Sequence, residues 1–199
     1  MSDLICITNR SLCRGDFFTQ IEKIAKAHPK AIVLREKDLL PDEYYTLAKQ
    51  VMEICEKYET PCVLHSFTDV AKTLDCRFIH LPLAVLRNMT SEDKQFFDVI
   101  GASCHSARDA KEAEQLRCTY ITAGHVFDTD CKKGLSGRGL DFLESVCKAV
   151  NIPVYAIGGI GTENYAAVKN VGASGACMMS GFMTCEDATE YIREIEDEV

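Results

Sequence analysis

The chain has 199 residues, of which 47% are hydrophobic and 26% are charged, a balance typical of a folded domain and not of a disordered segment. Its 30 acidic and 22 basic residues give a net charge of −8, which speaks against nucleic acid as a partner. No apolar run reaches the roughly 18 residues of a membrane span, so a membrane is not an expected partner either. We expect a single domain over residues 1–199.

Eleven cysteines are distributed along the chain, and most of them lie inside apolar runs. No two of them have the Cys-x-x-Cys spacing that is typical of a structural zinc site. A thiol inside an apolar run behaves as a small hydrophobic side chain. We therefore expect reduced thiols and a cytoplasmic location.

Short apolar runs rich in β-branched residues recur along the chain and predict strands. Amphipathic stretches between them predict helices, and the stretch after the fourth run is the weakest of these. The predicted strands span 4–8, 31–35, 61–65, 77–81, 98–103, 119–124, 153–159 and 174–180. The clearest predicted helices span 42–58, 109–116, 139–150, 163–171 and 185–199.

The alternation of strands with helices predicts the fold class. Parallel strands need a long crossover connection, so this alternation implies parallel pairing. We expect an α/β fold that is a single compact (β/α)8 TIM barrel, with about 25 residues per unit. A doubly wound open sheet is the alternative. Such a sheet would carry a G-x-G-x-x-G turn after its first strand, and residues 7–15, ITNRSLCRG, lack that spacing.

Glycines lie at the ends of the last two predicted strands. Gly158 and Gly159 end the seventh strand, Ser180 ends the eighth, and Gly181 follows it. In a barrel these two loops commonly form a phosphate site, because glycine lets the backbone approach a ligand and the next helix offers N–H groups. Tight turns alone are the alternative explanation. We expect phosphate binding at these four residues.

Two basic residues follow the second predicted strand. Arg35 and Lys37 alternate with Glu36, so in an extended segment the two basic side chains point to one side and Glu36 points to the other. We expect Arg35 and Lys37 to bind a carboxylate or phosphate of the substrate. A structural salt bridge of the arginine is the alternative.

His125 follows the sixth predicted strand, and Lys132 lies ahead of it in the next loop. Nearby cations favour a neutral imidazole, which can accept a proton near neutral pH. From position alone, a structural histidine is nearly as well supported. The roles of Asp128, Asp130 and Cys131 in the same loop stay open.

Paired carboxylates are absent from the ends of the predicted strands. The third strand ends in His65-Ser66, and the fourth runs into Pro82-Leu83. A magnesium ion that bridges a diphosphate usually takes one or two carboxylates. We therefore expect neither a metal ion nor another cofactor.

Three segments of the chain carry a resemblance to a known family: YITAGHVFDTDCKKGLSGRGLDFL (120–143), IPVYAIGGI (152–160) and MMSGF (178–182). They resemble the TenI family, which is grouped with the thiamine phosphate synthases. The resemblance extends over nearly the whole chain and implies the same compact barrel. Arg35, Lys37, Ser103 and the glycine loops match the synthases, which implies that Ser103 binds substrate. The Asn-Asp pair and the second acidic residue that hold magnesium in the synthases are missing here.

The thiazole tautomerases of this family carry a histidine where His125 stands and need no metal. The resemblance therefore implies a thiazole tautomerase of thiamine biosynthesis. This isomerase would aromatise a thiazole carboxylate phosphate by a proton shift at His125. In that reaction Arg35, with Lys37 or Lys132, would orient the carboxylate, and the 132–139 loop would close over the ligand.

Two other functions stay open. One is a thiamine phosphate synthase, a transferase that couples an aminopyrimidine diphosphate to thiazole phosphate. The other is a non-catalytic, regulatory barrel that binds a phosphorylated ligand. A small phosphorylated thiazole is the expected partner, and the oligomeric state is open, with a homodimer as one possibility.

Overall fold

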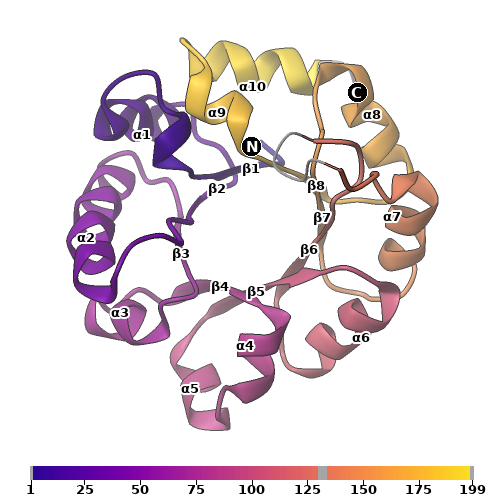
Figure 1. Ribbon diagram of the computed structural model, residues 1–199, viewed down its shortest axis with the longest axis horizontal. Helices are drawn as coiled ribbons and strands as arrows, with labels where there is room; N and C mark the ends of the chain where they lie inside the picture. The colour runs from indigo at the N-terminus through magenta and orange to yellow at the C-terminus, as the bar shows by residue number, and fades with distance from the viewer. Residues whose placement is uncertain (1, 130–133, 198–199) are drawn as a thin grey trace.

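The computed structural model describes residues 2–129 and 134–197, and its strands close into a barrel (Figure 1). All neighbouring strands are parallel, and β1 pairs with β8 through Leu4 and Ala176. The TIM-barrel prediction is confirmed, because this closing pair leaves no open edge as a doubly wound sheet would. The strands are β1 (Leu4–Ile7), β2 (Ala31–Leu34), β3 (Cys62–His65), β4 (Phe78–Pro82), β5 (Val99–Cys104), β6 (Tyr120–Gly124), β7 (Val154–Ile157) and β8 (Gly175–Met178).

Helices surround the barrel, as the view along its axis shows (Figure 1). The five helices singled out by periodicity are present as α2, α6, α7, α8 and α10. The weak stretch after β4 forms two short helices, α4 and α5, of six residues each. The helical elements are η1 (Arg10–Leu12), α1 (Phe17–Lys26), α2 (Pro41–Lys57), α3 (Thr68–Thr73), α4 (Leu83–Asn88), α5 (Ser91–Phe96), α6 (Ala107–Gln115), α7 (Gly139–Cys147), α8 (Thr162–Asn170), α9 (Ser180–Thr184) and α10 (Ala188–Glu196). Among the described residues no helix is long and apolar enough to cross a membrane.

The hydrophobic core has two parts. The larger part lies between the helices and the outer face of the strands, and the smaller part fills the inside of the barrel. Ile5, Val33 and Val63 belong to the inner cluster, together with the rings of Tyr120 and Tyr155. Because strands of this kind are covered on both faces, their sequences are continuously apolar, which is the pattern that predicted them.

The strand register places two histidines, a glycine and a tyrosine of the inner cluster in one row across four strands. His65 on β3 is aligned with His80 on β4, and His80 is aligned with Gly101 on β5. Gly101 is in turn aligned with Tyr120 on β6. Residues in register on neighbouring parallel strands point to the same side of the sheet. The register therefore brings together residues that are distant in sequence.

Tyr44 on α2 fastens this helix to two strands. Its buried hydroxyl donates to the carbonyl of Leu34 at 2.6 Å and accepts from the backbone N–H of His65 at 2.9 Å. The ring stacks on Phe67, with 4.1 Å between centroids. One phenol thus satisfies a donor and an acceptor at the ends of β2 and β3, where the strands lead into the cavity described below.

Replacing Tyr44 with Phe should lower the free energy of unfolding by about 1–3 kcal/mol, because a buried carbonyl and a buried N–H lose their partner. Urea unfolding measures this change. Tyr45→Phe is the matched control on the same helix, since Tyr45 is partly exposed and has no recorded hydrogen bond within the described residues. Equal effects of the two substitutions would contradict the structural role given to the Tyr44 hydroxyl.

Candidate active site

A cavity of about 650 Å³ opens at the carboxyl ends of the strands. TIM-barrel enzymes have their active sites at this end of the barrel. Most residues that the sequence singled out lie in its wall: Arg35, Lys37, Ser103, His125, Gly158, Gly159, Ser180 and Gly181. Lys132, Asp130 and Cys131 lie outside the described residues.

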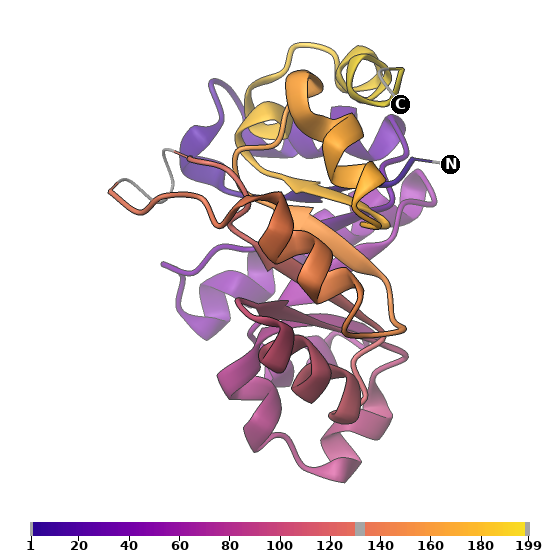
Figure 2. The ribbon, with the colours of Figure 1, turned by 90° about the vertical axis from the view of Figure 1, so that its right-hand side faces the viewer.

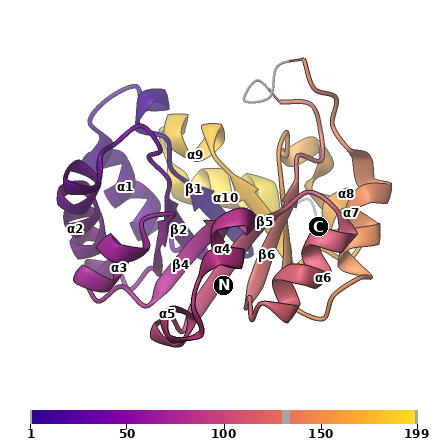
Figure 3. The ribbon, with the colours of Figure 1, turned by 60° about the horizontal axis from the view of Figure 1, so that its bottom comes forward.

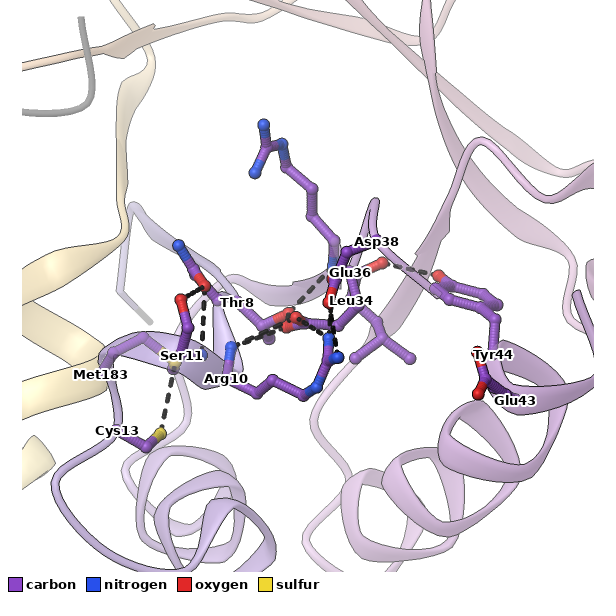
Figure 4. Close-up of polar contacts among 12 residues, drawn as sticks. Thr8, Arg10, Ser11, Cys13, Leu34, Glu36, Asp38, Glu43, Tyr44 and Met183 are labelled. Carbon is purple, nitrogen blue, oxygen red and sulfur yellow. Dashed lines mark hydrogen bonds and ion pairs between the residues drawn. The ribbon is translucent and has the colours of Figure 1, made fainter. Parts of the chain in front are cut away.

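The basic pair after β2 is held by a buried carboxylate. Arg35 and Lys37 line the cavity, whereas Glu36 between them is 3% exposed and lies outside the cavity wall. Glu36 accepts hydrogen bonds from the Thr8 hydroxyl at 2.7 Å and from the backbone N–H of Arg10 at 3.0 Å (Figure 4). The Thr8 hydroxyl also accepts from the backbone N–H of Arg35 at 2.9 Å. These bonds fix the end of β2 so that the two basic side chains face the cavity.

Arg10 completes this cluster and was not anticipated as a functional residue. Its guanidinium lies 3.1 Å from Glu36 and donates two hydrogen bonds to the carboxylate of Asp38, at 2.8 and 2.6 Å (Figure 4). The hydrogen bonds from Arg10 hold the pKa of Asp38 below its usual value. Arg10 therefore compensates the negative charge of the buried Glu36. As a result, Glu36 does not offset the positive charge of Arg35 in the cavity wall.

Two histidines form part of the cavity wall, at the ends of β3 and β4. The rings of His65 and His80 stack with centroids 5.7 Å apart, and both side chains are buried. Burial, reinforced by His80 and by the charges of Arg35 and Lys37, lowers the pKa of His65 to about 3. Burial and Arg35 lower the pKa of His80 to about 4. Both imidazoles are thus neutral at pH 7 and add hydrogen-bonding groups but no charge.

These two buried histidines should make the protein less stable as the pH falls. An unfolded histidine has a pKa of about 6.5, so between about pH 6.5 and about pH 4 the unfolded chain binds more protons than the native one. At about pH 5 each histidine should lower the free energy of unfolding by up to about 2 kcal/mol, compared with a pH well above about 6.5. Urea midpoints at about pH 7.5 and about pH 5 measure the loss.

The substitution His65→Asn should make that loss smaller. His28→Asn is the control, because His28 is exposed and precedes β2 at the opposite end of the barrel. If His65→Asn loses as much stability between the two pH values as the unmodified chain does, His65 is not the source of the pH dependence.

The glycines after β7 are required by packing. Gly158 and Gly159 have φ angles of +103° and +66°, in the left-handed region that favours glycine. A Cβ on Gly158 would lie 2.4 Å from the Cβ of His125, and one on Gly159 would lie 2.4 Å from the carbonyl oxygen of Asp128. The close approach that excludes a side chain is thus to the segment after β6. The phosphate-binding role of these glycines stays a prediction that rests on their place in the cavity wall.

His125 lies in the cavity wall but is also engaged by its own loop. Its Nε2 is 3.2 Å from the carbonyl oxygen of Leu135, and its carbonyl accepts from the N–H of Arg138 at 3.0 Å. The N–H of Gly137 donates to the carboxylate of Asp128 at 2.6 Å. These bonds tie the two described parts of the connection between β6 and α7 to each other near the end of β6. Further from β6, the connection projects from the barrel (Figures 2 and 3).

The described side chains do not fit the magnesium ion that a thiamine phosphate synthase implies. Within residues 2–129 and 134–197 no group of three His, Cys, Asp or Glu side chains could hold a metal ion. The cavity wall has one described carboxylate, Asp109, which accepts a hydrogen bond from the backbone N–H of His105 at 3.0 Å. Magnesium prefers carboxylate and water oxygens in octahedral geometry, which two stacked imidazoles do not supply.

Comparison with known proteins assigns the family. The family model described as thiamine monophosphate synthase matches residues 4–182. The chain belongs to this family. A relative from Fusobacterium nucleatum named thiamine-phosphate synthase is 30% identical over 195 residues, which cover 95% of this chain and 93% of the relative. A relative of the same name from Desulfitobacterium hafniense is 33% identical and covers 98% of this chain and 95% of its own length.

A solved structure agrees with these relatives. The thiamine phosphate pyrophosphorylase from Pyrococcus furiosus superimposes with a TM-score of 0.83 at 28% identity, covering 98% of this chain and 94% of its own. A second pyrophosphorylase structure, from Bacteroides thetaiotaomicron, has a TM-score of 0.70 at 18% identity, which supports the fold alone.

The expectation of a thiazole tautomerase, and with it of an isomerase, is wrong. Relatives that match nearly the whole chain are named thiamine-phosphate synthases, and the solved structure from Pyrococcus furiosus is named a thiamine phosphate pyrophosphorylase. The error came from reading the missing carboxylates and His125 together as the mark of an isomerase. The absence of paired carboxylates from the described cavity wall does not by itself identify a different reaction. The role of His125 as the base of that proton shift falls with the reaction.

Proposed function

We propose that the chain is a transferase of thiamine biosynthesis that couples an aminopyrimidine diphosphate to thiazole phosphate and releases diphosphate. The observation that carries the proposal is the full-length similarity to thiamine-phosphate synthases on the same barrel. The cavity is of a suitable size for this reaction, because pockets for small ligands typically have volumes of about 300–1,000 Å³.

The residues of the wall suit phosphorylated substrates. Arg35 makes no ion pair with a carboxylate of the described chain, so its charge is available to an anion in the cavity. A guanidinium binds phosphate in a bidentate manner. The backbone around Gly159, Ser180 and Gly181 is the second candidate for holding a phosphate, on the side of the cavity facing β7 and β8. Ser103 on β5 offers a hydroxyl to the same cavity.

A second candidate function is a barrel that binds a phosphorylated thiazole without turnover. The observation that favours it is the cavity wall, where the described residues offer no pair of carboxylates for the magnesium ion of a synthase. Both functions use the same anion-binding residues, so binding alone does not distinguish them. Product formation does.

The assay that tests the transferase combines the purified protein with both substrates, once with magnesium and once with a chelator. We expect thiamine phosphate and diphosphate to form in equal amounts. Saturable binding of thiazole phosphate without product would support the binding barrel in place of the transferase. If neither substrate binds, both functions are wrong.

Arg35→Ala should reduce kcat/KM by about 10- to 100-fold, or weaken thiazole phosphate binding by the same factor if no turnover occurs, because a charged hydrogen bond to the anion is lost. Arg117→Ala is the matched control. Arg117 is exposed and lies just before β6, at the opposite end of the barrel. An Arg35→Ala protein as active as the control would remove Arg35 from the anion site.

The location proposed for this activity is the cytoplasm. The ten described cysteines are free thiols. Burial raises the pKa of several of them, including Cys6 and Cys177, and so keeps them protonated and unreactive. So many free thiols are typical of a reducing compartment.

A further inference from the structure

A chain of hydrogen-bonding groups runs from inside the barrel to the cavity. The hydroxyl of Tyr120 lies 2.9 Å from Nδ1 of His80, and Nε2 of His80 lies 2.9 Å from Oγ of Ser103. The three residues come from neighbouring strands, β6, β4 and β5. Ser103 and His80 line the cavity, whereas Tyr120 is buried in the inner core cluster.

Gly101 makes this arrangement possible. It is aligned with His80 on one side and with Tyr120 on the other. A Cβ at Gly101 would lie 2.2 Å from Cζ of Tyr120 and 2.5 Å from Nδ1 of His80. Since β5 has no side chain at this point, the tyrosine and the histidine bond directly across it. Ser103 is two residues further along β5 and therefore points to the same side, one row nearer the cavity.

The direction of the hydrogen bonds follows from the buried phenol. Burial raises the pKa of Tyr120 well above its usual value, so the phenol keeps its hydrogen. Within the described residues, Nδ1 of His80 is the acceptor in reach of that hydrogen. A buried hydroxyl without an acceptor is unfavourable, so Tyr120 donates to Nδ1.

The proton of His80 is then on Nε2. Because burial lowers the pKa of His80 to about 4, the ring is neutral and carries one proton. With Nδ1 accepting, that proton is on Nε2 and is donated to Oγ of Ser103. The Thr122 hydroxyl also donates to the same oxygen, at 3.5 Å. The hydrogen of the Ser103 hydroxyl is left to point into the cavity.

We propose that Tyr120 and His80 are positioning residues that set Ser103 as a hydrogen-bond donor to an acceptor atom of the bound substrate. In the opposite tautomer, with the proton on Nδ1, Nε2 of His80 would accept the hydrogen of the Ser103 hydroxyl. The Tyr120 hydroxyl would then have no acceptor in Nδ1. The identity of the substrate rests on the function proposed above, whereas the tautomer of His80 does not.

The tautomer is measured without any turnover. In protein labelled with nitrogen-15 at histidine, we expect Nδ1 of His80 to have the shift of an unprotonated ring nitrogen and Nε2 that of a protonated one. The His80 signals are assigned as those lost in His80→Gln. The reverse pattern, with a proton on Nδ1, would overturn the proposal whatever the activity of the chain.

A double-mutant cycle tests the coupling to substrate. Tyr120→Phe should lower kcat/KM by about 2- to 10-fold, which is the effect of one neutral hydrogen bond. Combined with Ser103→Ala, it should cause no further loss, because both changes remove the same donor. Effects that multiply would mean that Tyr120 acts by packing alone, and the proposal would be wrong.

Tyr155→Phe is the matched control for this cycle. Tyr155 is buried, and its ring packs edge-on against Tyr120 with 5.9 Å between centroids. Its hydroxyl does not take part in the hydrogen bonds that link Tyr120, His80 and Ser103. We expect it to leave kcat/KM unchanged. If the protein binds but does not turn over, the same cycle is measured on the dissociation constants of thiazole phosphate and aminopyrimidine diphosphate. Failure of the transferase and failure of the positioning role are then seen separately.

Discussion

The alignment of neighbouring strands determines most of what this barrel can do. Eight parallel strands that close on themselves bring all their carboxyl ends to one face. In this chain the same register places His65, His80, Gly101 and Tyr120 in one row across four strands. A shift of one residue in any of these pairs would turn the side chain out of the barrel. The positions of these side chains in the site therefore depend on the strand register as well as on the identity of each residue.

The fold could be predicted from the sequence because its signals are local. Continuous β-branched runs mark strands that are covered on both faces, and the alternation with amphipathic stretches requires parallel crossovers. Short helices such as α3 and α9 carry too few turns to show a periodicity, and their positions depend on packing against the strands. Local pattern therefore gave the architecture but not all of its helices.

The site was harder to predict than the fold. Residues at strand ends, such as Arg35 and Ser103, could be placed at the cavity from their position alone. The bond between His80 and Tyr120 could not, because the two residues are 40 positions apart and meet only through the register across Gly101. The glycines after β7 were associated with a ligand, but contacts with the segment after β6 are sufficient to require them. A pair of glycines indicates that other atoms approach the backbone closely, but it does not show whether those atoms belong to a ligand or to the protein itself.

The lack of paired carboxylates in the described cavity wall has an electrostatic consequence of its own. A pair of carboxylates beside Arg35 would compensate its charge and then need a divalent cation before an anion could enter. The wall at β3 and β4 holds two buried imidazoles that stay neutral at pH 7, since burial lowers the pKa of both. A neutral ring leaves the field of the guanidinium intact, and Arg10 compensates Glu36 on the far side of the strand. The described wall thus has a positive charge that comes from its side chains, and this charge favours the binding of an anion.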